Sequence, residues 1–316
     1  MPSTPNITLL FAHGNGFCKQ VWDPIVRRLQ ASPLLRQPAT STEFVTFDLP
    51  FHGANRDESV PATLLLDDSS TPRVKHPSSA WADWAPAAVL EQVQALRRAQ
   101  DENKLPRTKL IGVGHSMGAA SLWKAEVQHP GTFDGLVLFE PIYMLRTKES
   151  RGSGSFLVSV TLKRESKWPS REAAVAHIEG YRNFASWDRE MLRAYMDGAL
   201  VQDDASSSTV LATHPHIEAA IYSGVPLELT EEEVGRPRCP IRLLSGGRSR
   251  IVLRPAFEPM VAAHPHIYGF VRPIDGASHV MLMEKPDESA TQILAELAQL
   301  APFRTPEVGG GDRARL

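Results

Sequence analysis

The feature that most constrains this chain is a serine set between two glycines, where an apolar run gives way to a helix-like run. Residues 112–118 read Gly-Val-Gly-His-Ser-Met-Gly, preceded by the apolar run Lys109–Val113 and followed by helix-like residues 119–127. This pattern at a strand-to-helix junction predicts a turn too sharp for side chains at the flanking positions. Such a turn would lift the Ser116 hydroxyl clear of the backbone. The amides at the helix N-terminus would then lie behind it, where a developing oxyanion could be stabilised.

Strand-like and helix-like segments alternate through most of the chain. Apolar residues that suit both faces of a buried sheet recur in several of the strand-like segments. The alternation predicts a parallel, doubly wound sheet of about six strands. The strands are expected at Thr8–Ala12, Phe44–Asp48, Lys109–Val113, Leu136–Phe139, Ile241–Leu244 and Tyr268–Val271, with helices near residues 21–29, 80–100 and 287–300.

The middle of the chain begins with a polar, Gly/Ser-rich stretch at residues 146–155 and then shows helix-capping serines, which predicts an inserted helical segment. Ser170 is expected to cap one helix, and Ser186 to cap a second that runs through Leu200. The polar, Pro-rich stretch from residue 54 to 79 predicts a loop over one rim of the sheet. The resulting division is a core of residues 1–144 and 238–303, a helical cap of residues 145–237, and a flexible tail of residues 304–316.

Composition excludes several classes of partner. The net charge of −2 leaves no electrostatic footprint for nucleic acid. No apolar run approaches the roughly 20 residues of a membrane span, and the first residues lack the layout of a signal peptide. The two cysteines, Cys18 and Cys239, cannot form a disulfide framework, so we expect an intracellular protein.

The last three residues indicate a more specific location. Ala314, Arg315 and Leu316 are similar to the Ser-Lys-Leu type of peroxisomal address, which an import receptor reads at a free C-terminus. The glycine-rich residues 309–313 before them form a tether suited to presenting it. We therefore expect a peroxisomal protein that binds the import receptor. The alternative is a disordered tail on a cytoplasmic protein.

Three segments carry a family resemblance. Almost the whole chain resembles the α/β-hydrolase superfamily, and the more specific segments are residues 10–19, residues 112–118, and residues 167–171 together with 186–188. Within it they are similar to a fungal group of toxin-biosynthesis hydrolases and a peroxisomal lipase, whose members often carry peroxisomal C-termini. The resemblance implies the α/β-hydrolase fold. The antiparallel strands that usually open that sheet are expected to be missing, because the first strand begins near the start of the chain.

A serine hydroxyl becomes a good nucleophile only when a base removes its proton as it attacks. In the fold that the resemblance implies, this base is a histidine on the loop after the final strand. His279 occupies that place, within Gly-Ala-Ser-His at residues 276–279. We therefore expect His279 to be the general base.

The third member of the triad is less conventional. Most superfamily members carry an aspartate after the strand that follows the insertion. Here residues 244–250 contain no carboxylate, and Ser249 stands near the expected position. Glu140, at the end of the strand after the elbow, is the expected acid, since a carboxylate there can reach the same imidazole Nδ1. Asp275, close to His279 in sequence, is the alternative.

Two backbone amides should form the oxyanion hole. One belongs to Met117, directly after the nucleophile, and the other to the turn at residues 13–16. Asn15 is the favoured donor in that turn, with Gly16 or Phe17 as alternatives. His13, His52 and His115 are expected to be structural hydrogen-bonding residues rather than catalysts.

No cofactor or metal is expected. The pairs His214/His216 and His264/His266 resemble metal ligands, but no HExxH or CxxC motif supports them. Arg248 and Arg250 belong either to a solvated loop or to a contact with an anionic substrate group. Four tryptophans could line an acyl pocket or fill the core, namely Trp81, Trp84, Trp168 and Trp187.

These expectations describe a lipase- or esterase-like serine hydrolase that cleaves a small-molecule acyl ester or thioester through an acyl-enzyme intermediate. An acyltransferase, a C–C hydrolase or an epoxide hydrolase on the same fold stays open. Epoxide hydrolases of this fold normally use an aspartate nucleophile, so Ser116 counts against them. A non-catalytic ligand-binding protein of the same fold is the remaining alternative.

Overall fold

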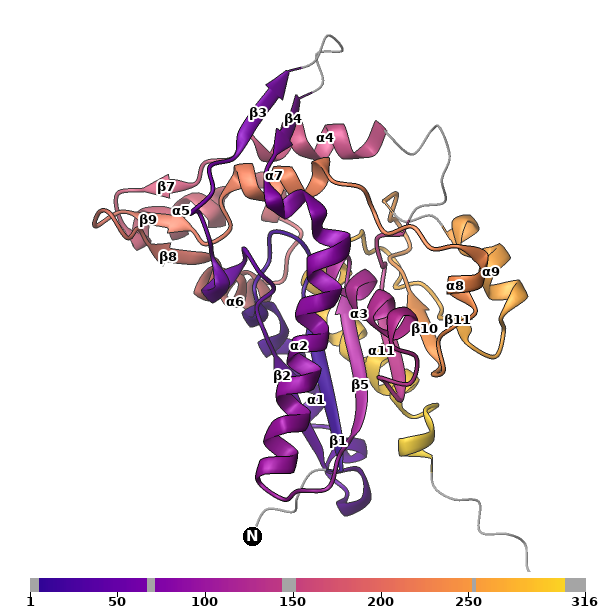
Figure 1. The fold of residues 1–316 in the computed structure, drawn as a ribbon. Coiled ribbons are helices and arrows are strands. Elements are labelled where there is room, and N and C mark those ends of the chain that lie inside the picture. The colour runs from indigo at the N-terminus through magenta and orange to yellow at the C-terminus, as the bar shows by residue number, and fades with distance from the viewer. Residues whose placement is uncertain (1–5, 67–71, 144–151, 252–253, 305–316) are drawn as a thin grey trace, which may run out of the picture.

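The centre of the molecule is a six-stranded parallel sheet. The computed structural model describes residues 6–66, 72–143, 152–251 and 254–304. The sheet has the order β11-β10-β6-β5-β1-β2, and every neighbouring pair is parallel (Figure 1). The sheet predicted from the sequence is confirmed. Its strands are β1 (Ile7–Ala12), β2 (Thr42–Thr46), β5 (Lys109–His115), β6 (Gly135–Phe139), β10 (Ile241–Leu244) and β11 (Tyr268–Phe270).

Helices cover both faces of this sheet. Alternate residues of β1 enter two different cores: Phe11 packs with Trp22 and Ile293, and Leu10 packs in the cluster that contains Trp123. Both faces are apolar because both are buried, as parallel sheets require. The helices of the core are α1 (Asp23–Gln30), α2 (Trp81–Glu102), α3 (Met117–Gln128), α9 (Glu258–Ala263), α10 (Met281–Glu284) and α11 (Pro286–Leu297).

The insertion between β6 and β10 contains helices and a small sheet. Its helices are α4 (Gly152–Thr161), α5 (Arg171–Gly180), α6 (Arg189–Ala199), α7 (Pro215–Ser223) and α8 (Glu231–Val234). Three short strands form an antiparallel sheet in the order β7-β9-β8: β7 (Lys167–Trp168), β8 (Leu200–Gln202) and β9 (Thr209–Leu211). The sequence did not predict these strands, because two or three residues are too few to show a period of two.

One of the two expected helix caps in the insertion is correct. The Ser170 side chain accepts a hydrogen bond from the Ala173 amide at the start of α5. Ser186 is not a cap, since α6 begins later and the Asp188 carboxylate accepts from the Glu190 and Met191 amides. A carboxylate at this position also complements the helix dipole.

The rim segment predicted to be a loop contains a hairpin instead. Strands β3 (Thr63–Leu66) and β4 (Pro72–Lys75) pair in antiparallel fashion and lie against α4 and α7 of the insertion (Figure 1). Val74 is buried there with Val158 and the alanines of α7. An isolated hairpin is marginal in water, so this contact with the insertion stabilises it.

Short 3-10 turns connect these elements at Lys19–Trp22, Pro33–Leu35, Pro38–Thr40, Gly53–Asn55, Pro77–Ala80, Arg182–Phe184, Arg254–Ala256 and Ala301–Phe303. Within the described ranges, no helix combines the length and the apolar character needed to cross a membrane. The expected tail beyond residue 304, with Ala314, Arg315 and Leu316, lies outside the described residues.

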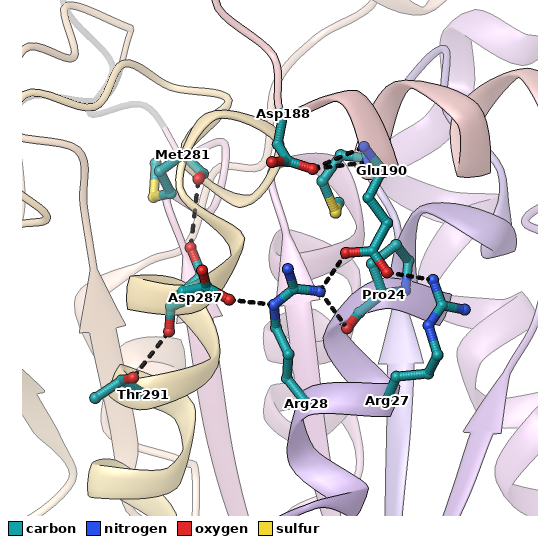
Figure 2. Close-up of polar contacts among 10 residues, drawn as sticks. Pro24, Arg27, Arg28, Asp188, Glu190, Met281, Asp287 and Thr291 are labelled. Atoms are coloured by element: carbon teal, nitrogen blue, oxygen red, sulfur yellow. Dashed lines mark hydrogen bonds and ion pairs between the residues drawn. The ribbon is translucent and has the colours of Figure 1, made fainter.

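Charged side chains join the insertion to the core beside the sheet (Figure 2). Glu190 of α6 accepts from Arg27 and Arg28 of α1 at 2.7 Å each, and Arg28 also donates to Asp287 of α11. Exposed pairs of this kind contribute about 0–1 kcal/mol each. They therefore orient α6 more than they stabilise it.

Candidate active site

Ser116 stands on a sharp turn between β5 and α3. Its backbone has φ 55° and ψ −118°, a conformation that non-glycine residues rarely adopt and that persists where the surrounding structure enforces it. A side chain at position 114 would approach the Ala119 Cα to 2.7 Å, and one at position 118 would approach the Ala12 carbonyl oxygen to 2.3 Å. Only glycine fits at either position, which is the geometry expected from the sequence pattern.

The structure brings Ser116, His279 and Glu140 together. His279 Nε2 lies 3.0 Å from Ser116 Oγ, and His279 Nδ1 lies 2.6 Å from Glu140 Oε2. The Ser116 amide donates to the Phe139 carbonyl at 2.9 Å, so the ends of β5 and β6 meet and place Glu140 beside the serine. The Glu140 side chain is fully buried, and that of His279 is 14% exposed.

The Glu140 carboxylate has donors for both of its oxygens. The Gly246 amide donates to Oε1 at 2.9 Å, and the Ser249 hydroxyl donates to Oε2 at 2.7 Å. Ser249 stands near the position where most superfamily members carry an aspartate, and here its hydroxyl donates to the Glu140 carboxylate. A buried charge requires partners of this kind.

Asp275, the alternative acid, lies elsewhere. Its carboxylate pairs with Arg272 at 2.9 Å and is 81% exposed. The imidazole Nδ1 of His279 faces Glu140 instead. The geometry therefore favours Glu140 as the partner of the histidine.

The loop that carries His279 is fixed by the core and by the insertion. His115 Nε2 donates to the His279 carbonyl at 2.9 Å. Glu284 accepts from the Ser278 amide at 2.6 Å and from the Ser186 hydroxyl of the insertion at 2.9 Å. Ser186 thus contributes to the histidine loop rather than to a helix cap. No local sequence pattern indicates this contact.

The residues of the two expected oxyanion donors are both associated with the serine. Met117 is the first residue of α3, and Asn15 lines the same pocket as Ser116. The Asn15 side chain donates to the Glu218 carbonyl at 3.2 Å, which ties its turn to α7. The Phe17 amide already donates to the Gly14 carbonyl at 3.3 Å, so Phe17 is a poor alternative donor.

His13, His52 and His115 are buried around this site and make structural contacts. The Leu49 amide donates to His13 Nε2 at 3.1 Å, and His52 Nε2 lies 3.1 Å from the Asn15 side-chain oxygen. Burial lowers the pKa of His13 to about 4 and the pKa values of His52 and His115 to about 3. All three rings are therefore neutral at pH 7.

These depressed pKa values predict a loss of stability in mild acid. In the unfolded chain these three histidines take up protons near pH 6.5, whereas in the folded chain they do not until about pH 4 or lower. The contribution of these histidines to the free energy of unfolding is fully present above pH 6.5 and is lost as the pH falls. The slope approaches about 4 kcal/mol per pH unit for three protons. Urea unfolding between pH 7 and pH 5 measures this slope. Replacing the exposed His129 by Gln should leave it unchanged, and a wild-type slope below that of one proton would contradict the prediction.

A buried ion pair within the insertion lies against the turn that carries Asn15. Arg164 donates to both carboxylate oxygens of Glu218, whose side chain is only 5% exposed. Burial alone would lower the pKa of Arg164, but the Glu218 carboxylate outweighs it and raises that pKa above its ordinary value. The pair therefore depends on both partners being present.

We expect Glu218→Gln to destabilise the protein by about 3–5 kcal/mol, because it leaves a buried guanidinium without its counter-charge. The matched control is Glu232→Gln, which removes an exposed partner of Arg236. That change should cost less than about 1 kcal/mol. Urea unfolding at pH 7 compares the two variants. Equal decreases in the free energy of unfolding would show that the buried pair contributes no more to stability than the exposed pair.

A pocket of about 340 Å³ opens over Ser116. Its volume lies within the ordinary range for small-molecule sites. None of the four tryptophans considered from the sequence lines it; Trp168 and Trp187 are core residues instead. The lining residues are Asn15, Phe17, Ser116, Leu157, Tyr222, Arg248, Ser249, Arg250, Ile251, Ser278, His279 and Val280.

Comparison with known proteins fixes the family. The sequence model of the alpha/beta hydrolase family matches residues 9–292. The chain belongs to the alpha/beta hydrolase family. Its fold is similar to that of a peroxisomal alpha-beta-hydrolase from Saccharomyces cerevisiae, with a TM-score of 0.71 and 18% identity over 95% of this chain and 78% of that one. It is also similar to the thioesterase domain from the curacin biosynthetic pathway, with a TM-score of 0.59 and 18% identity over 93% and 92% of the two chains.

Sequence relatives of this alpha/beta hydrolase are fungal. A type I acyl-CoA thioesterase from Penicillium brevicompactum is 36% identical over 174 residues, which are 54% of this chain and 34% of that protein. An abhydrolase domain-containing protein from Alternaria alternata is 28% identical over 97 residues, 31% of this chain and 36% of that protein. The matches thus span about a third of each relative. The fungal hydrolase resemblance expected from the sequence is confirmed.

Proposed function

We propose that this alpha/beta hydrolase is a serine hydrolase that cleaves a carboxylic ester or thioester through an acyl-enzyme intermediate. The observation that carries the proposal is the hydrogen-bonded chain from Ser116 through His279 to Glu140, with contacts of 3.0 and 2.6 Å. This arrangement of nucleophile, base and orienting acid is the one that acyl transfer requires.

In the proposed mechanism the Ser116 Oγ attacks the acyl carbonyl while His279 Nε2 takes its proton. Glu140 holds the imidazole in the productive tautomer and stabilises the imidazolium that forms. The Met117 and Asn15 amides donate to the oxyanion. His279 then protonates the departing alcohol or thiol, and later activates the water that releases the acid.

Residues 145–237 act in this proposal as the cap of the site. The cap supplies Leu157 from α4 and Tyr222 from α7 to the wall of the pocket, which core residues such as Ser116 also line. A roof of this kind excludes water and selects acyl shape. The pocket volume of about 340 Å³ suits an acyl group of medium length.

The activities of two similar proteins support the proposal of an ester or thioester substrate. One sequence relative is an acyl-CoA thioesterase, and a similar fold occurs in a biosynthetic thioesterase domain. The test is to measure hydrolysis of p-nitrophenyl esters of increasing chain length, together with a burst of p-nitrophenolate equal to the enzyme concentration. We expect both. Absence of turnover with every ester, and of labelling by a fluorophosphonate, would contradict the proposal and favour a non-catalytic binding protein.

A peroxisomal location is the remaining part of the proposal. It is in keeping with the peroxisomal hydrolase of similar fold and with the tripeptide Ala314–Leu316, which an import receptor would bind. A fluorescent reporter that carries residues 305–316 at its C-terminus should enter peroxisomes. The same reporter without the tripeptide should stay diffuse, and a diffuse signal from both would contradict the location.

A further inference from the structure

We infer that Arg248 and Arg250 form a subsite for an anionic group on the substrate. The inference rests on the proposed function and narrows its substrate class. The ligand chemistry is a carboxylate or phosphate oxygen, carried either by the acyl chain or by the leaving group. Both arginines lie in the wall of the pocket that contains Ser116 and His279, so the anion would belong to the molecule being cleaved.

The charge of the pocket wall is one-sided. Arg248 and Arg250 are its charged lining residues besides the titratable His279, and no aspartate or glutamate lines it within the described part of the chain. Glu140, beside His279, is fully buried, and its oxygens accept from His279, Ser249 and Gly246. A concave wall of one sign concentrates ligands of the opposite sign.

The absence of the usual acid explains how this wall arises. In most superfamily members the loop after β10 carries an aspartate, but here it carries Ser249 between two arginines. Ser249 turns inward to donate to Glu140 at 2.7 Å. The carboxylate is thus moved to the buried end of β6, and the pocket side of the loop keeps only positive charge.

The arginine nearer to the sheet is held in place. The Arg248 amide donates to the Ala277 carbonyl at 2.8 Å, and its Nε donates to the Gly276 carbonyl at 2.6 Å. The guanidinium therefore stands on the loop that leads to His279. Among the described residues, neither Arg248 nor Arg250 has a carboxylate partner within ion-pair distance. Guanidinium nitrogens arranged as a fork suit carboxylate and phosphate oxygens, which they bind in pairs.

Paired substrates, one anionic and one neutral, test the subsite. One pair has the same acyl chain with a terminal carboxylate or a terminal primary amide. The other pair joins one acyl group to coenzyme A or to the neutral thiol N-acetylcysteamine. The ratio of kcat/KM for the anionic over the neutral member is measured for the wild type, for Arg248→Gln, Arg250→Gln and the double variant. Arg236→Gln, at an exposed position just after α8, is the control.

We expect the double variant to lower this ratio by about tenfold to a hundredfold for one of the pairs, the range set by hydrogen bonds to a charged group. The affected pair identifies whether the anion is on the acyl chain or on the leaving group. The wild-type ratio should also fall as salt is raised, whereas Arg236→Gln should keep the wild-type ratio.

A ratio that stays within twofold of wild type for both pairs in the double variant would overturn the inference. Labelling of Ser116 by a neutral fluorophosphonate in the same preparations distinguishes failure of the subsite from failure of the proposed function. An unchanged ratio with labelled Ser116 contradicts the subsite alone. No labelling and no turnover in the wild type contradicts the proposed function, and the subsite with it.

Discussion

Ser116→Ala is expected to lower kcat for p-nitrophenyl ester hydrolysis by about 10⁶-fold, because loss of a serine nucleophile removes the contribution of the whole triad. Alanine retains the Cβ but removes the hydroxyl, which lies 3.0 Å from His279 Nε2. The variant should also fail to react with a fluorophosphonate. Turnover is measured with a stopped assay long enough to follow the residual rate.

Ser121→Ala is the matched control for this change. It removes a buried hydroxyl from α3, the helix that follows Ser116. Ser121 donates there to the Met117 carbonyl at 2.7 Å, away from the lining of the pocket. That variant should keep fluorophosphonate labelling. Turnover of Ser116→Ala within tenfold of the wild type, in a protein with an unchanged unfolding midpoint, would show that another group is the nucleophile.

Glu140→Gln is expected to lower kcat by about 10⁴-fold while the protein stays folded, the scale of loss when the orienting acid of a triad becomes an amide. The amide can donate to His279 Nδ1 across the present 2.6 Å contact, which would fix the wrong tautomer. It also cannot stabilise the imidazolium. The measurement is the pH–rate profile of ester hydrolysis, with Asp275→Asn as the control that removes the exposed carboxylate.

A second variant, with an aspartate placed at position 249 after β10, tests the same assignment. Ser249 Oγ lies 2.7 Å from the Glu140 oxygen that contacts His279, so a carboxylate at position 249 would stand close to the imidazole. We expect Ser249→Asp to recover part of the activity lost in Glu140→Gln. If Glu140→Gln alone kept near-wild-type kcat, the acid would have to be elsewhere.

The sheet could be predicted from the sequence because its signals are local. Buried parallel strands are short apolar runs, and each ends at a turn with its own chemistry. The elbow at Ser116 has glycines at 114 and 118 because the backbones around it leave no space for a side chain. Because only glycine fits at these two positions, the turn can be recognised from the residue types alone.

The features that sequence reasoning missed depend on distant contacts. The β3–β4 hairpin is stabilised by α4 and α7, and the β7-β9-β8 sheet joins strands of two or three residues. Neither has a periodic pattern of its own. Ser186 looked like a helix cap, but its hydroxyl donates to Glu284, 98 residues further along the chain.

The position of the proposed acid could be predicted from the sequence, but its hydrogen-bond partners could not. The absence of a carboxylate from residues 244–250 and the presence of Glu140 after β6 can both be read from the sequence. The sequence gives no indication that Ser249 and the Gly246 amide donate to that carboxylate. These contacts form only when β6 and β10 pair in the folded sheet.

The most direct test of the proposed triad is the rate at which a fluorophosphonate labels Ser116 in the wild type, Glu140→Gln and Asp275→Asn. Labelling depends on serine activation and needs no knowledge of the natural substrate. We expect rapid labelling of the wild type and of Asp275→Asn, and labelling slower by several orders of magnitude in Glu140→Gln. Labelling of Glu140→Gln at the wild-type rate would contradict the triad of Ser116, His279 and Glu140.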